Sequence, residues 1–143
     1  MKNIYYITNM FPGKTDNYGI FCKKVYDFFQ SSDIFTVKKI SAIYGKSNNK
    51  IYNIFRYAFL LLNIMFNLLF CIRKIDLIYI QYVWKHAFFV SFFSKCIKNK
   101  KVVINFHGED LTNYAKLSGF EKKCFKNICN FADLIIVPSN YFK

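Results

Sequence analysis

The residues best placed for chemistry follow a buried strand in the stretch Lys101 to Asp110. His107 and Gly108 come directly after residues 102–106, a run suited to a strand buried on both faces of a parallel sheet. Ligands of such sheets gather beyond the carboxyl ends of the strands, and glycine lets the backbone turn or approach a ligand without a Cβ in the way. The pair predicts a functional site. The alternative is a strand-ending glycine beside a structural histidine.

A second candidate, for phosphate chemistry, is Gly13-Lys14-Thr15 in the loop after the first predicted strand. In a P-loop the lysine reaches the phosphates and the hydroxyl holds magnesium. That motif needs a glycine where this chain has Thr8, and its helix should begin at the lysine and threonine, whereas Asp16 to Gly19 intervene. None of the later predicted strands ends in the aspartate of a magnesium-binding partner strand. We therefore reject a P-loop.

Strands that alternate with helices would position these residues. Strands are predicted at Lys2 to Asn9, Asp33 to Ala42, Asp76 to Tyr82, Lys101 to Phe106 and Asp133 to Val137. Helices are predicted from Ile20 onward and at Ile51 to Lys74, Ala87 to Ile97 and Glu121 to Asn130, with His86 as an ordinary polar residue before the third. This alternation predicts an α/β fold with a doubly wound parallel sheet, formed as one domain by residues 1–143.

The predicted helix Ile51 to Lys74 is the most apolar part of the chain. Its uncharged run, Tyr57 to Ile72, has 16 residues, whereas a membrane span needs about 20. At 100° per residue its polar side chains fall within about 80° of one another; they are Asn53, Arg56, Asn63, Asn67 and Lys74. We expect a crossover helix largely buried in protein, with a helix lying in a membrane interface as the alternative.

Composition restricts the class of partner. Hydrophobic residues make up 54% of the 143 residues, which excludes disorder, and the net charge of +13 suggests an anionic partner. Part of that charge reflects a bias toward Lys, Asn, Ile, Phe and Tyr that A/T-rich coding produces. The lysines are scattered and the aromatics follow core periodicity, so we expect no nucleic acid. Five cysteines without Cys-x-x-Cys, and no secretory signal, indicate a cytoplasmic chain.

With the strand ends in place, the chain resembles the Rossmann-like N-terminal half of a GT-B glycosyltransferase of the family-4 type. The segments that carry the resemblance, in family order, are Met10-Phe11-Pro12 with Tyr18-Gly19-Ile20-Phe21, then Asp76 to Tyr82, then Val102 to Asp110 followed by Ala132 to Ser139. The resemblance implies transfer of a sugar from a nucleotide-sugar donor to a glycan or lipid-linked acceptor. It also implies retention at the anomeric carbon and no required metal or other cofactor, and the chain has no Asp-x-Asp.

The resemblance also implies roles for particular residues. His107 would hydrogen-bond the donor sugar, and Asp110 would orient the sugar or its loop. Amides at a helix start suit a phosphate because of the helix dipole. The expected contacts to donor and phosphate are Gly19, Ile20, Gly108 and Ser139. The expected contacts to the acceptor are Gln81 and Tyr82.

The chain departs from the family pattern at two points. Tyr79 and Gln81 stand where the family's strand usually reads His-x-His. The chain also ends at Lys143, before the family's nucleotide-binding C-terminal domain, so we expect it to be inactive alone. It would be either a fragment or a membrane-surface subunit that binds the acceptor for a two-chain enzyme. We expect a cytoplasmic location with peripheral contact at the inner face of the membrane.

Overall fold

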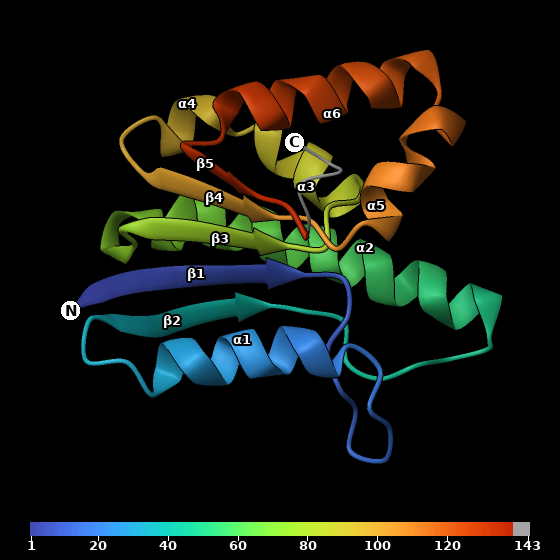
Figure 1. The fold of residues 1–143 in the computed structure, drawn as a ribbon, viewed down its shortest axis with the longest axis horizontal. Helices are drawn as coiled ribbons and strands as arrows, with labels where there is room; N and C mark the ends of the chain where they lie inside the picture. Colours follow the sequence, from blue (N-terminus) through green and yellow to red (C-terminus); the bar gives the residue numbers. More distant parts are fainter. Residues whose placement is uncertain (139–143) are drawn as a thin grey trace.

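The computed structural model describes residues 1–138, and five parallel strands form a single sheet in the order β2-β1-β3-β4-β5 (Figure 1). The strands are β1 (Lys2–Thr8), β2 (Phe35–Ser41), β3 (Leu77–Gln81), β4 (Lys101–Asn105) and β5 (Leu134–Ile136). The strand order reverses between β1 and β3, so this pair forms the switch point at which ligands of parallel sheets bind. The predicted α/β fold with a parallel sheet is confirmed.

The helices connect consecutive strands as the alternating pattern predicted. They are α1 (Ile20–Gln30), α2 (Lys50–Phe66), α3 (Lys85–Ser91), α4 (Ser94–Ile97), α5 (Glu109–Thr112) and α6 (Gly119–Phe131). A π-helical turn, Asn67–Cys71, and a 3-10 turn, Ile72–Lys74, continue α2, and we call the whole segment Lys50–Lys74 the long helix. The helix predicted at residues 87–97 is divided into α3 and α4, because the chain turns at Phe92 and Phe93.

Helices cover both faces of the sheet, as Figure 1 shows. Alternate residues of β1 point to opposite faces, so Ile4 and Tyr6 pack with residues of α1, whereas Tyr5 and Ile7 pack with the long helix, α3 and α6. The two faces therefore have separate hydrophobic clusters.

The long helix is not largely buried, so that prediction is wrong. Its inner side packs on the sheet through Leu60, Ile64, Leu68 and Ile72. Part of its polar stripe also turns inward, since Asn67 is buried and the Ser41 hydroxyl donates to the side-chain oxygen of Asn63, whereas Asn53 and Lys74 are exposed. The bond from Ser41 of the edge strand β2 and the bond from Arg56 to the Gly45 carbonyl in the following loop orient the helix so that most of its apolar circumference faces outward.

His86 is also not the ordinary polar residue that the sequence predicted. It lies in the first turn of α3 and is fully buried. Burial lowers its pKa from 6.5 to about 3, so the imidazole is neutral at neutral pH. Its backbone N–H donates to the Tyr57 hydroxyl at 2.8 Å, which joins α3 to the long helix.

Candidate active site

The carboxyl ends of three neighbouring strands form the centre of the site. Thr8, Gln81 and Asn105 lie side by side in the register of β1, β3 and β4. His107 and Gly108 follow β4 within three residues, so they stand at the edge where the sequence predicted a ligand to bind. Parallel pairing of the strands is enough to bring these strand ends close together.

The His107 ring is held by contacts from β3 and α1. The Gln81 amide nitrogen lies 3.0 Å from His107 Nε2, and the buried Tyr6 hydroxyl bonds the other end of the same amide. The ring of Phe21, from the first turn of α1, lies 4.4 Å away between centroids. Burial lowers the pKa of His107, partly opposed by the Asp110 charge, so the imidazole is neutral at neutral pH. A neutral, fixed imidazole suits a directed hydrogen bond to a sugar hydroxyl.

Asp110 is buried, and its carboxylate is occupied by backbone groups. Its oxygens accept from the N–H groups of His107 at 3.0 Å, Val83 at 3.0 Å and Leu111 at 3.1 Å. Because Val83 follows β3 and His107 follows β4, the carboxylate ties the two strand ends together. This geometry suits the expected role in orienting the loop. Gly108 contributes a φ of +90°, which a residue with a side chain rarely adopts.

Gly19 and Ile20 lie where α1 begins, and both have contacts within the loop. Gly19 has a φ of +75°, and a Cβ there would lie 2.8 Å from the carbonyl carbon of Met10. The position therefore needs glycine for the close approach of two backbone segments. The Ile20 N–H donates to the Asn17 carbonyl at 3.0 Å. Ser139 lies outside the described residues.

The two residues expected to contact the acceptor differ in exposure. Gln81 is fully buried between Tyr6 and His107, whereas Tyr82 is half-buried and its ring stacks on His107 at 6.2 Å. Tyr82 has a φ of +58°, an unusual conformation for a bulky residue and one that clusters at functional sites. Its hydroxyl donates to Glu109 at 2.8 Å, and burial with this carboxylate raises the pKa of Tyr82.

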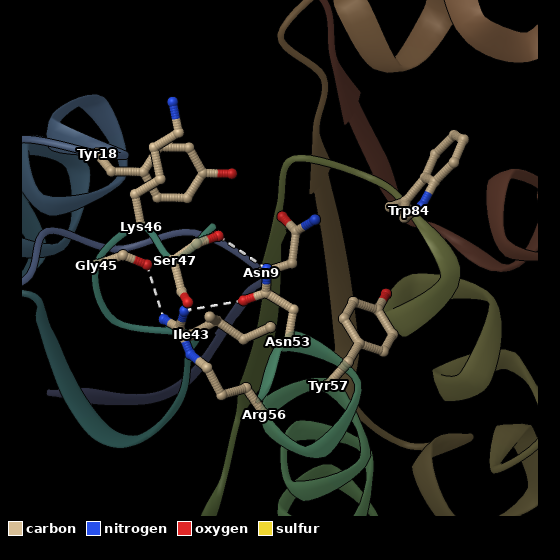
Figure 2. Close-up of a pocket in the computed structure, with 10 residues that line it drawn as sticks. All are labelled: Asn9, Tyr18, Ile43, Gly45, Lys46, Ser47, Asn53, Arg56, Tyr57 and Trp84. Atoms are coloured by element: carbon tan, nitrogen blue, oxygen red, sulfur yellow. Dashed lines mark hydrogen bonds between the residues drawn. The ribbon is translucent and has the colours of Figure 1, made fainter. Parts of the chain in front are cut away.

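Two adjoining cavities continue the site along the carboxyl edge. One has a volume of about 350 Å³ and the other about 200 Å³, and they share Asn9, Tyr18 and Trp84 in their walls. The smaller cavity reaches Tyr82, and the larger reaches the start of the long helix at Arg56. Figure 2 shows Trp84 across the larger cavity from Tyr18. We call the two cavities together the edge groove.

The edge groove contains functional groups that the sequence did not single out. Lys46 and Arg56 line it, and no carboxylate does so in the part of the chain that the structure describes. Arg56 donates to the carbonyl of Gly45 at 2.7 Å, while the buried side-chain oxygen of Asn9 has no hydrogen-bond partner among residues 1–138. Position directly after β1 could have identified Asn9. The sequence pattern places Arg56 only in the polar stripe of the long helix.

The titratable side chains of the described residues do not gather into a metal site. Within residues 1–138 there is no group of three or more His, Cys, Asp or Glu side chains that could hold a metal ion. The groups at this edge include the His107 imidazole, the Glu109 and Asp110 carboxylates, the Tyr82 hydroxyl and the cations of Lys46 and Arg56.

Comparison with known proteins matches residues 5–143 to the family model described as Glycosyltransferase Family 4. No curated protein and no solved structure matches the chain. The family match covers nearly all of the sequence and includes the strand ends, the His-Gly loop and every residue that lines the edge groove. The chain belongs to glycosyltransferase family 4 and carries a glycosyltransferase-type α/β domain.

Proposed function

We propose that residues 1–143 form the acceptor-side domain of a retaining glycosyltransferase, which moves a sugar from a nucleotide-sugar donor to a glycan or lipid-linked acceptor. The observation that supports this most is the edge groove, which ends at Tyr82, the residue stacked on His107. An acceptor lying in the groove would therefore reach the residue that the family resemblance assigns to the donor sugar. The nucleotide would be bound mainly by a domain that these residues do not include.

The walls of the edge groove suit a sugar that carries an anionic group. Tyr18, Tyr82 and Trp84 offer aromatic faces with polar edges, which pack against the apolar faces of sugar rings. Lys46 and Arg56 line the larger cavity and would attract a phosphate, such as that of a lipid-linked acceptor. We therefore favour a phosphate-bearing acceptor over a neutral glycan.

His107 would act on the donor sugar in this proposal. The leaving group is a nucleoside diphosphate, so catalysis must stabilise charge that develops as the glycosidic bond breaks. A neutral imidazole held by Gln81 can hydrogen-bond a sugar hydroxyl throughout that step, and it carries no charge that would pair with the phosphate instead. Asp110 would act through the loop, because its oxygens already accept backbone N–H groups.

A second candidate function is an acceptor-binding subunit of a two-chain glycosyltransferase at a membrane surface. It is favoured by the exposed apolar side of the long helix. The two functions differ in where the donor-binding domain is encoded. An open reading frame for a second Rossmann-like domain directly after codon 143 would favour a single chain, whereas a separate co-purifying protein would favour two chains.

Acceptor binding to the purified chain tests the proposal. Short-chain polyprenyl diphosphate sugars, titrated by calorimetry, should bind without any donor. Lys46→Gln should weaken that binding several-fold, whereas Lys123→Gln, which removes the same charge from an exposed position on α6, should not. Equal weakening by both variants would mean a nonspecific charge effect, and no binding by the unaltered chain would refute the acceptor role.

A further inference from the structure

The long helix presents an exposed apolar surface, which we call the outer apolar face. Its members are large, exposed side chains at spacings of 4, 3, 4, 3 and 1 residues, which is one side of a helix. They are Phe55, Phe59, Leu62, Phe66, Leu69 and Phe70. Phe59 and Phe70 are each 70% exposed, although a side chain of this kind is usually buried. A continuous face of six such residues marks an interaction surface.

Specific hydrogen bonds fix the orientation of this face. The Ser41 hydroxyl of β2 donates to the Asn63 side chain, and Arg56 donates to the Gly45 carbonyl at 2.7 Å in the loop that follows β2. The polar stripe is thus committed to contacts with β2 and its following loop. Rotating the helix to bury the outer apolar face would break all of these bonds.

The chain segment that carries the outer apolar face has charges of one sign only. Residues 34–75 contain no Asp or Glu, and their basic residues are Lys38, Lys39, Lys46, Lys50, Arg56, Arg73 and Lys74. A cavity of about 540 Å³ lies at the end of the face, lined by Phe70 together with Lys38, Lys39 and Lys74. Aromatic and basic side chains in one place suit a partner surface that has an apolar interior covered by a layer of anionic groups.

The long helix is long and apolar enough to cross a membrane by length and composition, with 25 residues and a mean hydropathy of 1.8 over its most apolar window. Its inner side, however, packs on the sheet through Leu60, Ile64 and Leu68. A helix docked in this way cannot be surrounded by lipid. It can only be immersed from the side, to the depth of its outer apolar face, as interfacial helices are.

We propose that the outer apolar face docks on an anionic phospholipid bilayer, with the long helix lying in the interface plane and the cavity of Lys38, Lys39 and Lys74 receiving lipid phosphates. A second copy of the chain suits this face less well. Pairing two such faces would bring cations of both copies together, and residues 34–75 offer no carboxylate to neutralise them. The inference does not rest on the proposed function, because docking needs neither donor nor acceptor.

Sedimentation with vesicles tests the apolar contribution. The protein should bind vesicles of equal parts phosphatidylglycerol and phosphatidylcholine. The double variant Phe59→Ser, Phe66→Ser should lower the partition coefficient about tenfold or more. Phe28→Ser removes an aromatic ring that is 67% exposed on α1, on the other face of the sheet, and should leave binding unchanged. Melting temperatures within a few degrees of the unaltered protein would show that the variants are folded.

The charge contribution is tested with Lys38→Gln, Lys39→Gln and Lys74→Gln combined. Binding to the anionic vesicles should fall several-fold and should also weaken in high salt, whereas binding to phosphatidylcholine alone should be weak throughout. The proposal is overturned if the Phe59, Phe66 variant binds as well as the Phe28 variant. It is also overturned if high salt does not weaken binding and only detergent releases the protein. A dimer that these substitutions dissociate, in a protein that does not bind vesicles, would overturn it as well.

Discussion

His107 and Asp110 differ in how much of their hydrogen-bonding capacity the fold already uses. Both oxygens of Asp110 accept hydrogen bonds from backbone N–H groups, so its carboxylate holds the loop in place. His107 is bonded through Nε2 to Gln81, and within the described residues its other ring nitrogen is not engaged. His107 is therefore the better candidate for direct contact with a substrate, and Asp110 for positioning it.

Replacing His107 should affect chemistry more than stability. In the complete enzyme, or in this domain fused to a matching C-terminal domain, His107→Ala should lower kcat more than it raises KM, because its hydrogen bond strengthens as the glycosidic bond breaks. Ile104→Ala removes a fully buried side chain of β4 and should instead cost about 2–5 kcal/mol of unfolding free energy. If His107→Ala melts as early as Ile104→Ala and the folded fraction keeps a normal rate, the histidine is structural.

Gly19 should be needed for stability and not only for donor binding. Gly19→Ala places a Cβ 2.8 Å from the Met10 backbone at a positive φ, so we expect a loss of about 1–3 kcal/mol and a lower melting temperature. Gly119→Ala is the matched control, because nothing lies within 4 Å of its Cβ position and the residue begins a helix. Equal melting temperatures for the two variants would contradict this account of Gly19.

His86 should make stability depend on pH. Its folded pKa of about 3 lies below its ordinary value of 6.5, so the unfolded chain binds a proton between these values that the folded chain does not. The contribution of His86 to the free energy of unfolding is therefore fully present above pH 6.5. It falls by roughly 1.4 kcal/mol per pH unit as the pH decreases from 6.5 toward 3. His86→Leu should reduce this slope in urea unfolding measured from pH 6.5 to 4.5. An unchanged slope would show that other groups control the loss.

At the scale of elements, the long helix differs from a usual surface helix, because it packs inward through Leu60, Ile64 and Leu68 and still leaves a large apolar side exposed. Ordinarily the apolar side packs inward and the polar side faces water. Here Asn63, Asn67 and Arg56 face the protein, while six large apolar residues face outward. The sequence defined the two sides by their spacing. Contacts with β2 and the loop after it decided which side turned inward.

The start of α6 is an element boundary that local sequence does determine. Ser118 and Glu121 form a capping box, in which each side chain bonds the other's backbone N–H. Ser118→Ala should therefore cost about 1 kcal/mol, measured by thermal unfolding. Ser31→Ala, at the end of α1, removes an exposed hydroxyl that, among residues 1–138, bonds only the Phe28 carbonyl, and it should cost less. A larger loss at Ser31 would mean that the cap is not the source of the effect.

At the scale of the whole molecule, the edge groove and the outer apolar face have different positions. The groove follows the carboxyl ends of the strands, whereas the outer apolar face runs along a helix that covers one side of the sheet. A domain that binds the donor at the carboxyl edge would leave the helix face open. The protein could therefore dock on a membrane and act on an acceptor at the same time.

We expect the 143-residue chain alone to show no turnover of any nucleotide-sugar, because the donor would be bound mainly elsewhere. The measurement is release of the nucleoside diphosphate from a panel of donors, with and without polyprenyl-linked acceptors. Turnover that is lost in His107→Ala would contradict the proposal, since it would show that these residues suffice for both donor binding and chemistry.

The sequence by itself determined the parallel sheet and the position of His107 and Gly108 at its edge. Strand-forming runs end at defined residues, and parallel pairing brings those ends together whatever else the chain does. Only the tertiary structure assembled Asn9, Arg56 and Trp84 into one groove, because they come from three separate segments. The tertiary structure also decided that His86 is buried and that the outer apolar face of the long helix is exposed. Periodicity divides a helix into a polar and an apolar side, but contacts with distant residues decide which side meets the core.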